Sequence, residues 1–221
     1  EIDESSYGPE HPDVARDLSN LSELLRVTNR LEEAEPLKRR VVTIFKKSLG
    51  ETHPNVATAL NNLALLLQDT NRMEEAEPLM QRALEIDESS FGPDHPNVAR
   101  DLNNLALLLK STNRLKEAEP LMRRALEIDE SSYSPEHPDV AIHLYNLAQL
   151  LKATNRMEGA EPLMRRTLES LVAFTRATGH PHPHLQIVLN NYGKLLKKMG
   201  KSDDEVLERL KTIAPEFVKE E

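Results

Sequence analysis

The first candidate for a catalytic site in this sequence is a histidine that lies close to an acidic or amide residue. The tetrad His-Pro-Asp/Asn-Val begins at His11, His53, His95 and His137. An imidazole next to a carboxylate can move protons in general acid–base catalysis. Four copies separated by equal steps of 42 residues nevertheless indicate one structural device, a capping or packing histidine, multiplied by duplication. We therefore expect no catalytic residue and no enzyme activity.

A second group of histidines alternates with proline and could in principle bind a transition metal. It consists of His180, His182 and His184. No cysteine or carboxylate accompanies them locally, and metal-binding loops ordinarily supply a fuller ligand shell. The sequence also has no phosphate-binding glycine loop, metalloprotease helix motif or nucleophile elbow. The prediction is that no metal or other cofactor is bound.

The charge balance narrows the class of partner. The chain has 28 lysines and arginines against 37 acidic residues, a formal net charge of -9. Binding to duplex nucleic acid depends on cationic contacts to phosphates, so this balance disfavours a nucleic-acid partner. An excess of acid mainly favours solubility.

Composition also bears on the compartment. Cysteine is absent, which fits a reducing compartment, and we expect a cytoplasmic location. No stretch approaches the roughly 20 apolar residues of a membrane span, and the first four residues lack the features of a signal peptide, so we expect no membrane association. Because residues 1–14 nearly repeat residues 85–98, the sequence is expected to be part of a longer protein.

The same tetrads define an internal repeat. They recur every 42 residues, and a degenerate copy begins 45 residues after His137, at His182. Self-similarity at a fixed period is typical of a repeat array. The sequence therefore predicts one array over residues 1–221, whose units are 1–10 (partial), 11–52, 53–94, 95–136, 137–181 and 182–221.

Apolar residues within each unit follow helical spacing. In the second full unit they occupy positions 56, 60, 63, 64 and 67, and then 73, 76, 80 and 83. Pro54 suits the first turn of one helix, and Asn71 is predicted to cap the next. At the carboxyl end, Gly200 can end a helix, and Ser202 with Glu205 can form a capping box. Each unit is predicted to be a helical hairpin.

A recurring proline interrupts the second helix of each hairpin. It removes one backbone hydrogen bond, so we expect a bend or a delayed start there. The aromatic residues Tyr7, Phe91 and Tyr133 also recur at one phase and are expected to pack between repeats. The prolines are Pro36, Pro78, Pro120 and Pro162.

Small residues spaced 12 and 7 apart identify the hairpin type. They are Ala64, Ala76 and Ala83 in one unit, with the motifs His-Pro-x-Val-Ala, Leu-Asn-Asn-Leu-Ala and Glu-Ala-Glu-Pro-Leu around them. This pattern resembles the tetratricopeptide repeat (TPR), in the 42-residue form found in kinesin light chains. The resemblance implies an all-α fold, a right-handed superhelix (α-solenoid) of antiparallel helical hairpins, and a concave groove that binds a partner protein.

The resemblance also implies that the first helix of each hairpin lines the groove. An amide can pair with both the C=O and the N-H of an extended peptide, so an asparagine column suits peptide capture. The alternative is that these amides bond neighbouring helices and fix the repeat. The column consists of Asn20, Asn62, Asn104, Asn146 and Asn191, with Asn61 and Asn103 beside it.

Charge is expected to differ between the two helices. Cations on the first helix include Arg16, Arg100, Lys110 and Lys152, whereas acids such as Asp87 lie on the second helix and its exit. A basic groove in an acidic protein would attract an acidic segment, although a charge run can also be a solvated face. We expect a scaffold that binds a protein or peptide, with an acidic segment favoured. The alternative is an assembly or sensor module that associates end to end or regulates a larger signalling protein.

Overall fold

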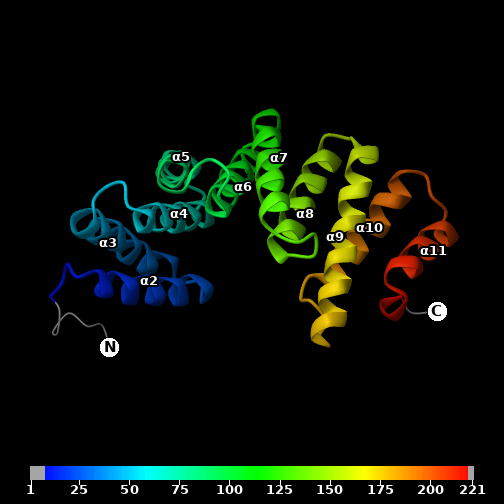
Figure 1. Cartoon of the computed structure of the whole chain (residues 1–221), viewed down its shortest axis with the longest axis horizontal. Helices are drawn as coiled ribbons and strands as arrows, with labels where there is room; N and C mark the ends of the chain where they lie inside the picture. The colour runs from blue at the N-terminus through cyan, green and yellow to red at the C-terminus, as the bar shows by residue number, and fades with distance from the viewer. Residues whose placement is uncertain (1–7, 219–221) are drawn as a thin grey trace. The chain divides into compact units, whose positions relative to one another are not determined.

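The computed structural model describes residues 8–218, and within them the chain forms ten α-helices and one 3-10 turn (Figure 1). We call α2, α4, α6, α8 and α10 the A helices and α3, α5, α7, α9 and α11 the B helices. Their bounds are α2 Pro12–Val27, α3 Leu31–Leu49, α4 Pro54–Asp69, α5 Met73–Phe91, α6 Pro96–Ser111, α7 Leu115–Ser132, α8 Pro138–Ala153, α9 Met157–Thr178, α10 Leu185–Lys198, α11 Asp203–Ile213 and η1 Pro215–Phe217.

The helices gather into two compact units. Unit 1 ends at Asn113 and contains α2 to α6, and unit 2 begins at Arg114 and contains α7 to α11 with η1. Consecutive A and B helices pack as hairpins, α2 with α3 and α4 with α5 in unit 1, and α8 with α9 and α10 with α11 in unit 2. The predicted all-α fold of helical hairpins is confirmed. That residues 1–221 form one continuous array stays a prediction.

The histidine of each full tetrad begins an A helix. In all four copies it is the N-cap, and its Nδ1 accepts a hydrogen bond from the backbone N-H two residues on, at 3.1 to 3.2 Å. Proline follows at the first helical position, where its missing N-H costs nothing. His95 also stacks on Phe91 and His137 on Tyr133, with ring centroids 4.4 and 3.9 Å apart. The repeated histidine therefore both caps and packs, whereas Tyr7 lies outside the described residues.

The asparagine between the two helices of a hairpin has a different role from the predicted one. Asn71 does not cap the B helix, whose N-cap is Arg72 without a side-chain cap bond. It ends the A helix instead, in the left-handed region at φ 60°. Its N-H bonds the carbonyl of Gln68 and the next N-H bonds that of Leu67, which is a Schellman motif. Asparagine tolerates this conformation better than most non-glycine residues, and Asn29, Asn113 and Asn155 repeat it.

The recurring proline lies inside the B helix and does not delay its start. Helix α3 begins at Leu31 and α5 at Met73, in both cases five residues before the proline. Of the two expected alternatives, the delayed start was therefore wrong, and the bend stays a prediction. Pro36 and Pro78 stand in the second turn, and both side chains are exposed, so the ring displaces no core residue.

Neighbouring hairpins cover one another's apolar faces. Leu66 of α4 is fully buried and packs with Leu25 of α2 and Ala34 of α3. The small residues Ala64, Ala76 and Ala83 are also fully buried. Small side chains allow the close approach of helices that this stacking requires, and each hairpin therefore depends on its neighbour for burial.

The last hairpin ends as predicted. Gly200 follows α10 at φ 84°, and Ser202 and Glu205 form the capping box of α11. In α11, Val206 and Leu210 are buried, whereas the exposed positions include Asp203, Asp204, Glu205, Leu207, Glu208 and Arg209. Apart from Leu207, the exposed side of this last helix is therefore polar.

Candidate protein-binding groove

A hollow opens beside the A helices of unit 1. It has a volume of about 390 Å³ and lies between α2, α3 and α4. We call it the first groove pocket. Seven of its eleven lining residues are polar, and the lining consists of Pro12, Asp13, Arg16, Ser19, Asn20, Val41, Phe45, Asn55, Thr58, Ala59 and Asn62.

A second hollow, of about 520 Å³, lies between α8, α9 and α10 in unit 2. We call it the second groove pocket. Ile142 and Ile187 expose about half of their surfaces beside it. Its lining consists of Pro138, Ala141, Ile142, Tyr145, Asn146, Thr167, Leu171, His182, Pro183, His184, Ile187 and Val188.

The two pockets occupy equivalent places in the repeat but differ in chemistry. Three repeat lengths separate Arg16 from Ile142 and Ser19 from Tyr145, and Thr58 corresponds to Ile187 once the three-residue insertion before α10 is allowed for. These three polar side chains of the first pocket are thus replaced by apolar or aromatic ones in the second, whereas Asn20 corresponds to Asn146, which is still an amide. The first pocket suits polar groups, and the second suits an apolar side chain.

The asparagine column lies along the A helices, and its members differ in surroundings. Asn20 and Asn62 line the first groove pocket, and Asn146 lines the second. Asn191 donates a hydrogen bond from Nδ2 to the hydroxyl of Tyr145 at 2.8 Å. Asn104 is half-buried on α6. Four amides are therefore partly accessible and Asn20 is exposed, as capture of a backbone would require.

The neighbouring amides are placed differently from the expectation. Asn61 and Asn103 are buried, at 3% and 6% exposure. Asn61 donates from Nδ2 to Oδ1 of Asp101 at 2.5 Å. Consecutive residues of a helix point about 100° apart, so Asn61 faces the next hairpin while Asn62 faces the pocket.

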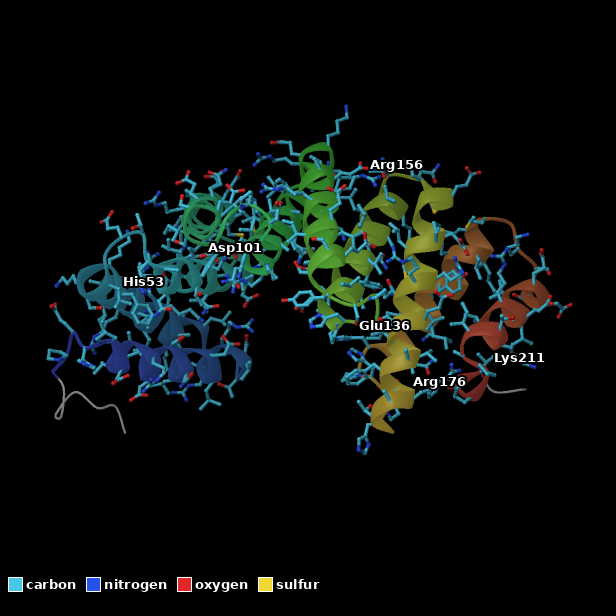
Figure 2. All side chains as sticks on the ribbon, in the orientation of Figure 1. His53, Asp101, Glu136, Arg156, Arg176 and Lys211 are labelled. Atoms are coloured by element: carbon cyan, nitrogen blue, oxygen red, sulfur yellow. The ribbon has the colours of Figure 1, made fainter. Side chains whose placement is uncertain are left out.

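Two buried carboxyl groups near Asn61 were not expected. Asp87, predicted to lie on an acidic surface, and Asp101 are both 0% exposed (Asp101 is labelled in Figure 2). Arg100 reaches both, at 3.2 Å to Asp87 Oδ2 and 2.9 Å to Asp101 Oδ1. Burial raises the pKa of both carboxyl groups, against the opposing effect of Arg100.

In unit 2 the equivalent positions hold a carboxylate and an imidazole. Asp129 of α7 and His143 of α8 are both buried, and His143 Nδ1 lies 2.9 Å from Asp129 Oδ2. The sequence carries a signal for these groups. At one repeat position it has Phe45, Asp87, Asp129 and Leu171, and at the facing position Ala59, Asp101, His143 and Val188. Polar residues replace apolar ones on both sides of the same two junctions, α5 with α6 and α7 with α8.

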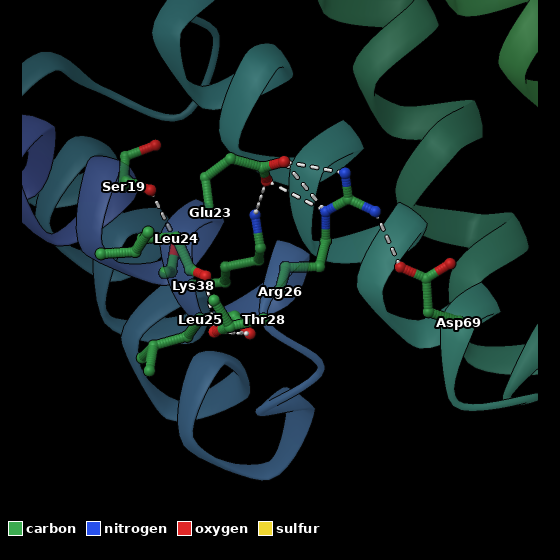
Figure 3. Close-up of polar contacts among 9 residues, drawn as sticks. Ser19, Glu23, Leu24, Leu25, Arg26, Thr28, Lys38 and Asp69 are labelled. Atoms are coloured by element: carbon green, nitrogen blue, oxygen red, sulfur yellow. Dashed lines mark hydrogen bonds and ion pairs between the residues drawn. The ribbon is translucent and has the colours of Figure 1, made fainter.

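Several of the predicted groove cations are engaged within the chain. Arg16 pairs with Asp13 at 3.0 Å, and Arg100 with the two buried aspartates. Arg26 joins Glu23 of its own helix to Asp69 of α4, at 2.7 and 3.0 Å (Figure 3). The hydrogen bond from Arg26 is the main cause of the lowered pKa of Glu23. In unit 1 these cations are therefore partly neutralised by acids.

Lys38 explains one departure of the first repeat from the others. It stands where the next repeat has the buried Met80, and its side chain is likewise buried. Its ammonium group lies 3.4 Å from Glu23 Oε2 (Figure 3), and burial is the main cause of its lowered pKa. The long aliphatic stem fills the core position while the charge reaches a carboxylate.

Three lysines of unit 2 are not neutralised in this way, unlike Lys197 and Lys201, which pair with Asp203 and Glu205. Lys152 of α8 feels the charges of Lys194 and Lys198 of α10, and burial, followed by these two charges, lowers its pKa. Among residues 8–218, none of the three forms an ion pair with an acidic side chain. We call them the lysine cluster. In unit 1, burial alone lowers the pKa of Lys110.

The alternating histidines form a local turn. His182 Nδ1 accepts a hydrogen bond from the backbone N-H of His184 at 3.1 Å, and the ring of His182 contacts Phe174. Burial lowers the pKa of His182. Across the described part of the chain, no three histidine, cysteine or acidic side chains cluster suitably for a metal ion. None of the helices found between residues 8 and 218 is long and apolar enough to cross a membrane.

Stacked hairpins with hollows between their A helices define a helical-repeat module for protein interaction. The family model described as tetratricopeptide repeat matches residues 18–89, 55–131 and 110–172, which together cover more than half of the chain. The chain therefore belongs to the tetratricopeptide-repeat family. None of the curated proteins compared with the chain matches it.

Solved structures agree with this assignment. A Podosopora anserina protein of nearly identical TPR-like repeats, named as of kinesin light chain type, is 22% identical with a TM-score of 0.75, over 95% of this chain and 99% of that one. BtubC (BKLC) from P. vanneervenii is 26% identical with a TM-score of 0.67, over 78% of this chain and 68% of that one. YrrB, a TPR protein with an unusual peptide-binding site, is 16% identical with a TM-score of 0.53, over 90% and 86%. The chain is thus similar in fold to kinesin light chain-like TPR proteins.

Proposed function

We propose that the chain is a non-catalytic scaffold that binds an extended acidic segment of a partner protein along its A helices. The observation that carries this proposal is the lysine cluster, three cations without acidic partners on α8 and α10, two of the three helices that line the second groove pocket. Elsewhere in unit 2 arginines are paired, as Arg156 is with Glu119 and Arg209 with Glu161. Unpaired like charges on one surface attract an acidic ligand.

The distance along α8 between the second groove pocket and the lysine cluster predicts the spacing of the groups in the bound segment. Ile142 and Lys152 are ten residues apart on α8, which corresponds to about 15 Å along the helix axis. An extended peptide covers that distance in about four or five residues. The favoured ligand therefore has an apolar residue and an acidic group separated by about that number of residues. The asparagine column would hold its backbone.

Calorimetric titration with synthetic peptides would test the proposal. The peptides carry one leucine and two glutamates, separated by one to eight residues, and the lysine cluster is weakened by Lys152→Gln with Lys194→Gln. We expect the best affinity at intermediate spacing and a loss of about tenfold or more in the double variant. Lys116→Gln, on an exposed position of α7, is the charge control. Equal affinity for all spacings and variants would show that the peptides do not bind at this surface.

Assembly through the first hairpin is the second candidate function. Leu24 of α2 is 59% exposed, whereas Leu66, at the same position of the next repeat, is fully buried by the preceding hairpin. Leu21 and Val27 extend this apolar surface. End-to-end stacking of copies finds less support because the exposed residues of α11 are polar apart from Leu207. Light scattering of wild type and Leu24→Ser over a range of concentrations would detect assembly, and identical monomer masses would exclude it.

A further inference from the structure

The buried carboxyl pair of unit 1 lies where α5 packs against α6. The groups that face it are Arg100 of α6, Asn61 of α4, and His95 in the turn before α6, whose charge acts on Asp87. Arg100 contributes two nitrogens to Asp101 Oδ1, Nε at 3.1 Å and Nη2 at 2.9 Å. The imidazole of His95 is already used as a helix cap.

The charges in this cluster do not balance without a proton. Two carboxylates and one guanidinium give a net charge of -1, and both carboxyl groups are completely buried. Desolvation makes such an uncompensated buried charge unfavourable. Asp87 Oδ1 and Asp101 Oδ2 find no hydrogen-bond partner among residues 8–218. One proton held by the pair restores neutrality and provides a donor.

The buried cluster lies at the repeat positions that, one repeat earlier, line the first groove pocket. Asp87 and Asp101 stand at the repeat positions of Phe45 and Ala59, which line the first groove pocket. Arg100 stands at the position of Thr58, which also lines that pocket. A change in the protonation of the cluster therefore acts directly beneath the surface formed by α4 and α6.

We propose that the Asp87–Asp101 pair is a proton-binding site that couples the α5–α6 junction, and with it the groove of unit 1, to pH. The proton site itself is independent of the proposed function. Only its effect on partner binding rests on that function. With one proton, the cluster is neutral and α6 stays packed on α5. Loss of the proton leaves one uncompensated negative charge in the junction and weakens that packing.

The direction of the pH effect follows from burial. Burial raises the pKa of Asp101 to about 7, above its value in the unfolded chain, where the group is solvated. A raised acid pKa in the folded state means that its contribution is fully present at low pH and declines as pH rises toward the folded pKa. The junction is therefore most stable on the acidic side of neutrality and weakest above it.

Urea unfolding of the full chain between pH 5.5 and 8 tests the proton site without any partner. We expect the wild-type midpoint to fall by about 0.5–1 M over this range. Asp101→Asn should remove most of that fall, because the amide cannot ionise. Asp94→Asn, which removes an exposed carboxyl group of the same unit, should retain it. An equal pH dependence in Asp101→Asn and wild type would overturn the proposal.

Carbon-13 NMR of the aspartate carboxyl groups keeps the proposal testable if Asp101→Asn fails to fold. In wild type we expect one carboxyl resonance of the Asp87–Asp101 pair to titrate near neutral pH. Two resonances that are both fully ionised at pH 5.5 would contradict the site.

Backbone amide NMR of α4 and α6 over the same pH range then tests the coupling to the groove surface of unit 1. We expect shifts at exposed residues of α4 and α6 that follow the carboxyl titration in wild type and disappear in Asp101→Asn, whereas a carboxyl titration without such shifts counts against the coupling. Failure of the leucine–glutamate peptides to bind counts against the proposed function alone, because those peptides address the second groove pocket of unit 2.

Discussion

Asn191 donates its side-chain amide to the hydroxyl of Tyr145 at 2.8 Å, and this bond joins α10 to α8 beside the second groove pocket. The two residues come from successive A helices, and Asn191 belongs to the asparagine column. One amide of the column therefore fixes the distance between two helices while its neighbours remain accessible. The structural role considered for the column is thus observed for Asn191, whereas ligand binding by the other members stays a prediction.

Removing this bond should loosen the wall of the pocket. Tyr145→Phe should lower the free energy of unfolding by about 0.5–1.5 kcal/mol, because the change deletes the acceptor and leaves the Asn191 amide without it. Tyr133→Phe is the matched control, since Tyr133 acts through ring stacking on His137. Urea denaturation compares the two variants, and equal losses would show that the hydroxyl of Tyr145 is not the cause.

A pair of leucines at one repeat position measures how much a hairpin gains from its neighbour. Leu66→Ala should cost about 2–5 kcal/mol, because Leu66 is fully buried against Leu25 and Ala34. Leu24→Ala should change stability by less than about 0.5 kcal/mol, because Leu24 is mostly exposed. Similar losses in the two variants, measured by urea denaturation of dilute protein, would indicate that another molecule covers Leu24.

The left-handed asparagine at the end of an A helix offers a backbone test. Asn71→Ala should destabilise the fold by about 1 kcal/mol, because alanine is strained at φ 60°. Asn71→Gly should be neutral or slightly stabilising, since glycine adopts this conformation without a steric cost. Thermal denaturation distinguishes the cases, and a larger loss in the glycine variant would point to a required contact of the Asn71 side chain.

The histidine caps can be tested by replacing the acceptor. His53→Ala removes the bond from Nδ1 to the Asn55 N-H and should cost about 0.5–2 kcal/mol. His53→Asn should recover most of this, because asparagine is among the preferred N-caps. If alanine and asparagine destabilise the protein equally, packing of the imidazole ring and not capping explains the residue.

The repeat period predicted the hairpins because helix starts and apolar faces recur with it. His53 and Pro54 located the start of an A helix correctly. Asn71 was assigned to the wrong helix, because an asparagine between two helices suits both an N-cap and a left-handed helix end, and local sequence does not separate these roles.

The groove was harder to predict than the fold. Asn61 and Asn62 are adjacent amides, and their different burial depends on how far the next hairpin turns, which sequence spacing alone does not define. Asp87 and Asp101 were missed because acidic residues are ordinarily exposed. Only the paired replacement of Phe45 and Ala59 by these two acids marks the buried site. The sequence identified Lys152 as a groove cation. Its proximity to the lysines of α10 follows only from the structure.

Mapping a bound peptide by NMR tests most directly whether the A helices hold the partner. A peptide with leucine and two glutamates at the favoured spacing would be titrated into protein labelled at isoleucine methyl groups. We predict shifts at Ile142 and Ile187, which flank the second groove pocket, and none at Ile86 and Ile128 of the B helices. Shifts confined to the B-helix isoleucines would contradict binding on the A-helix face.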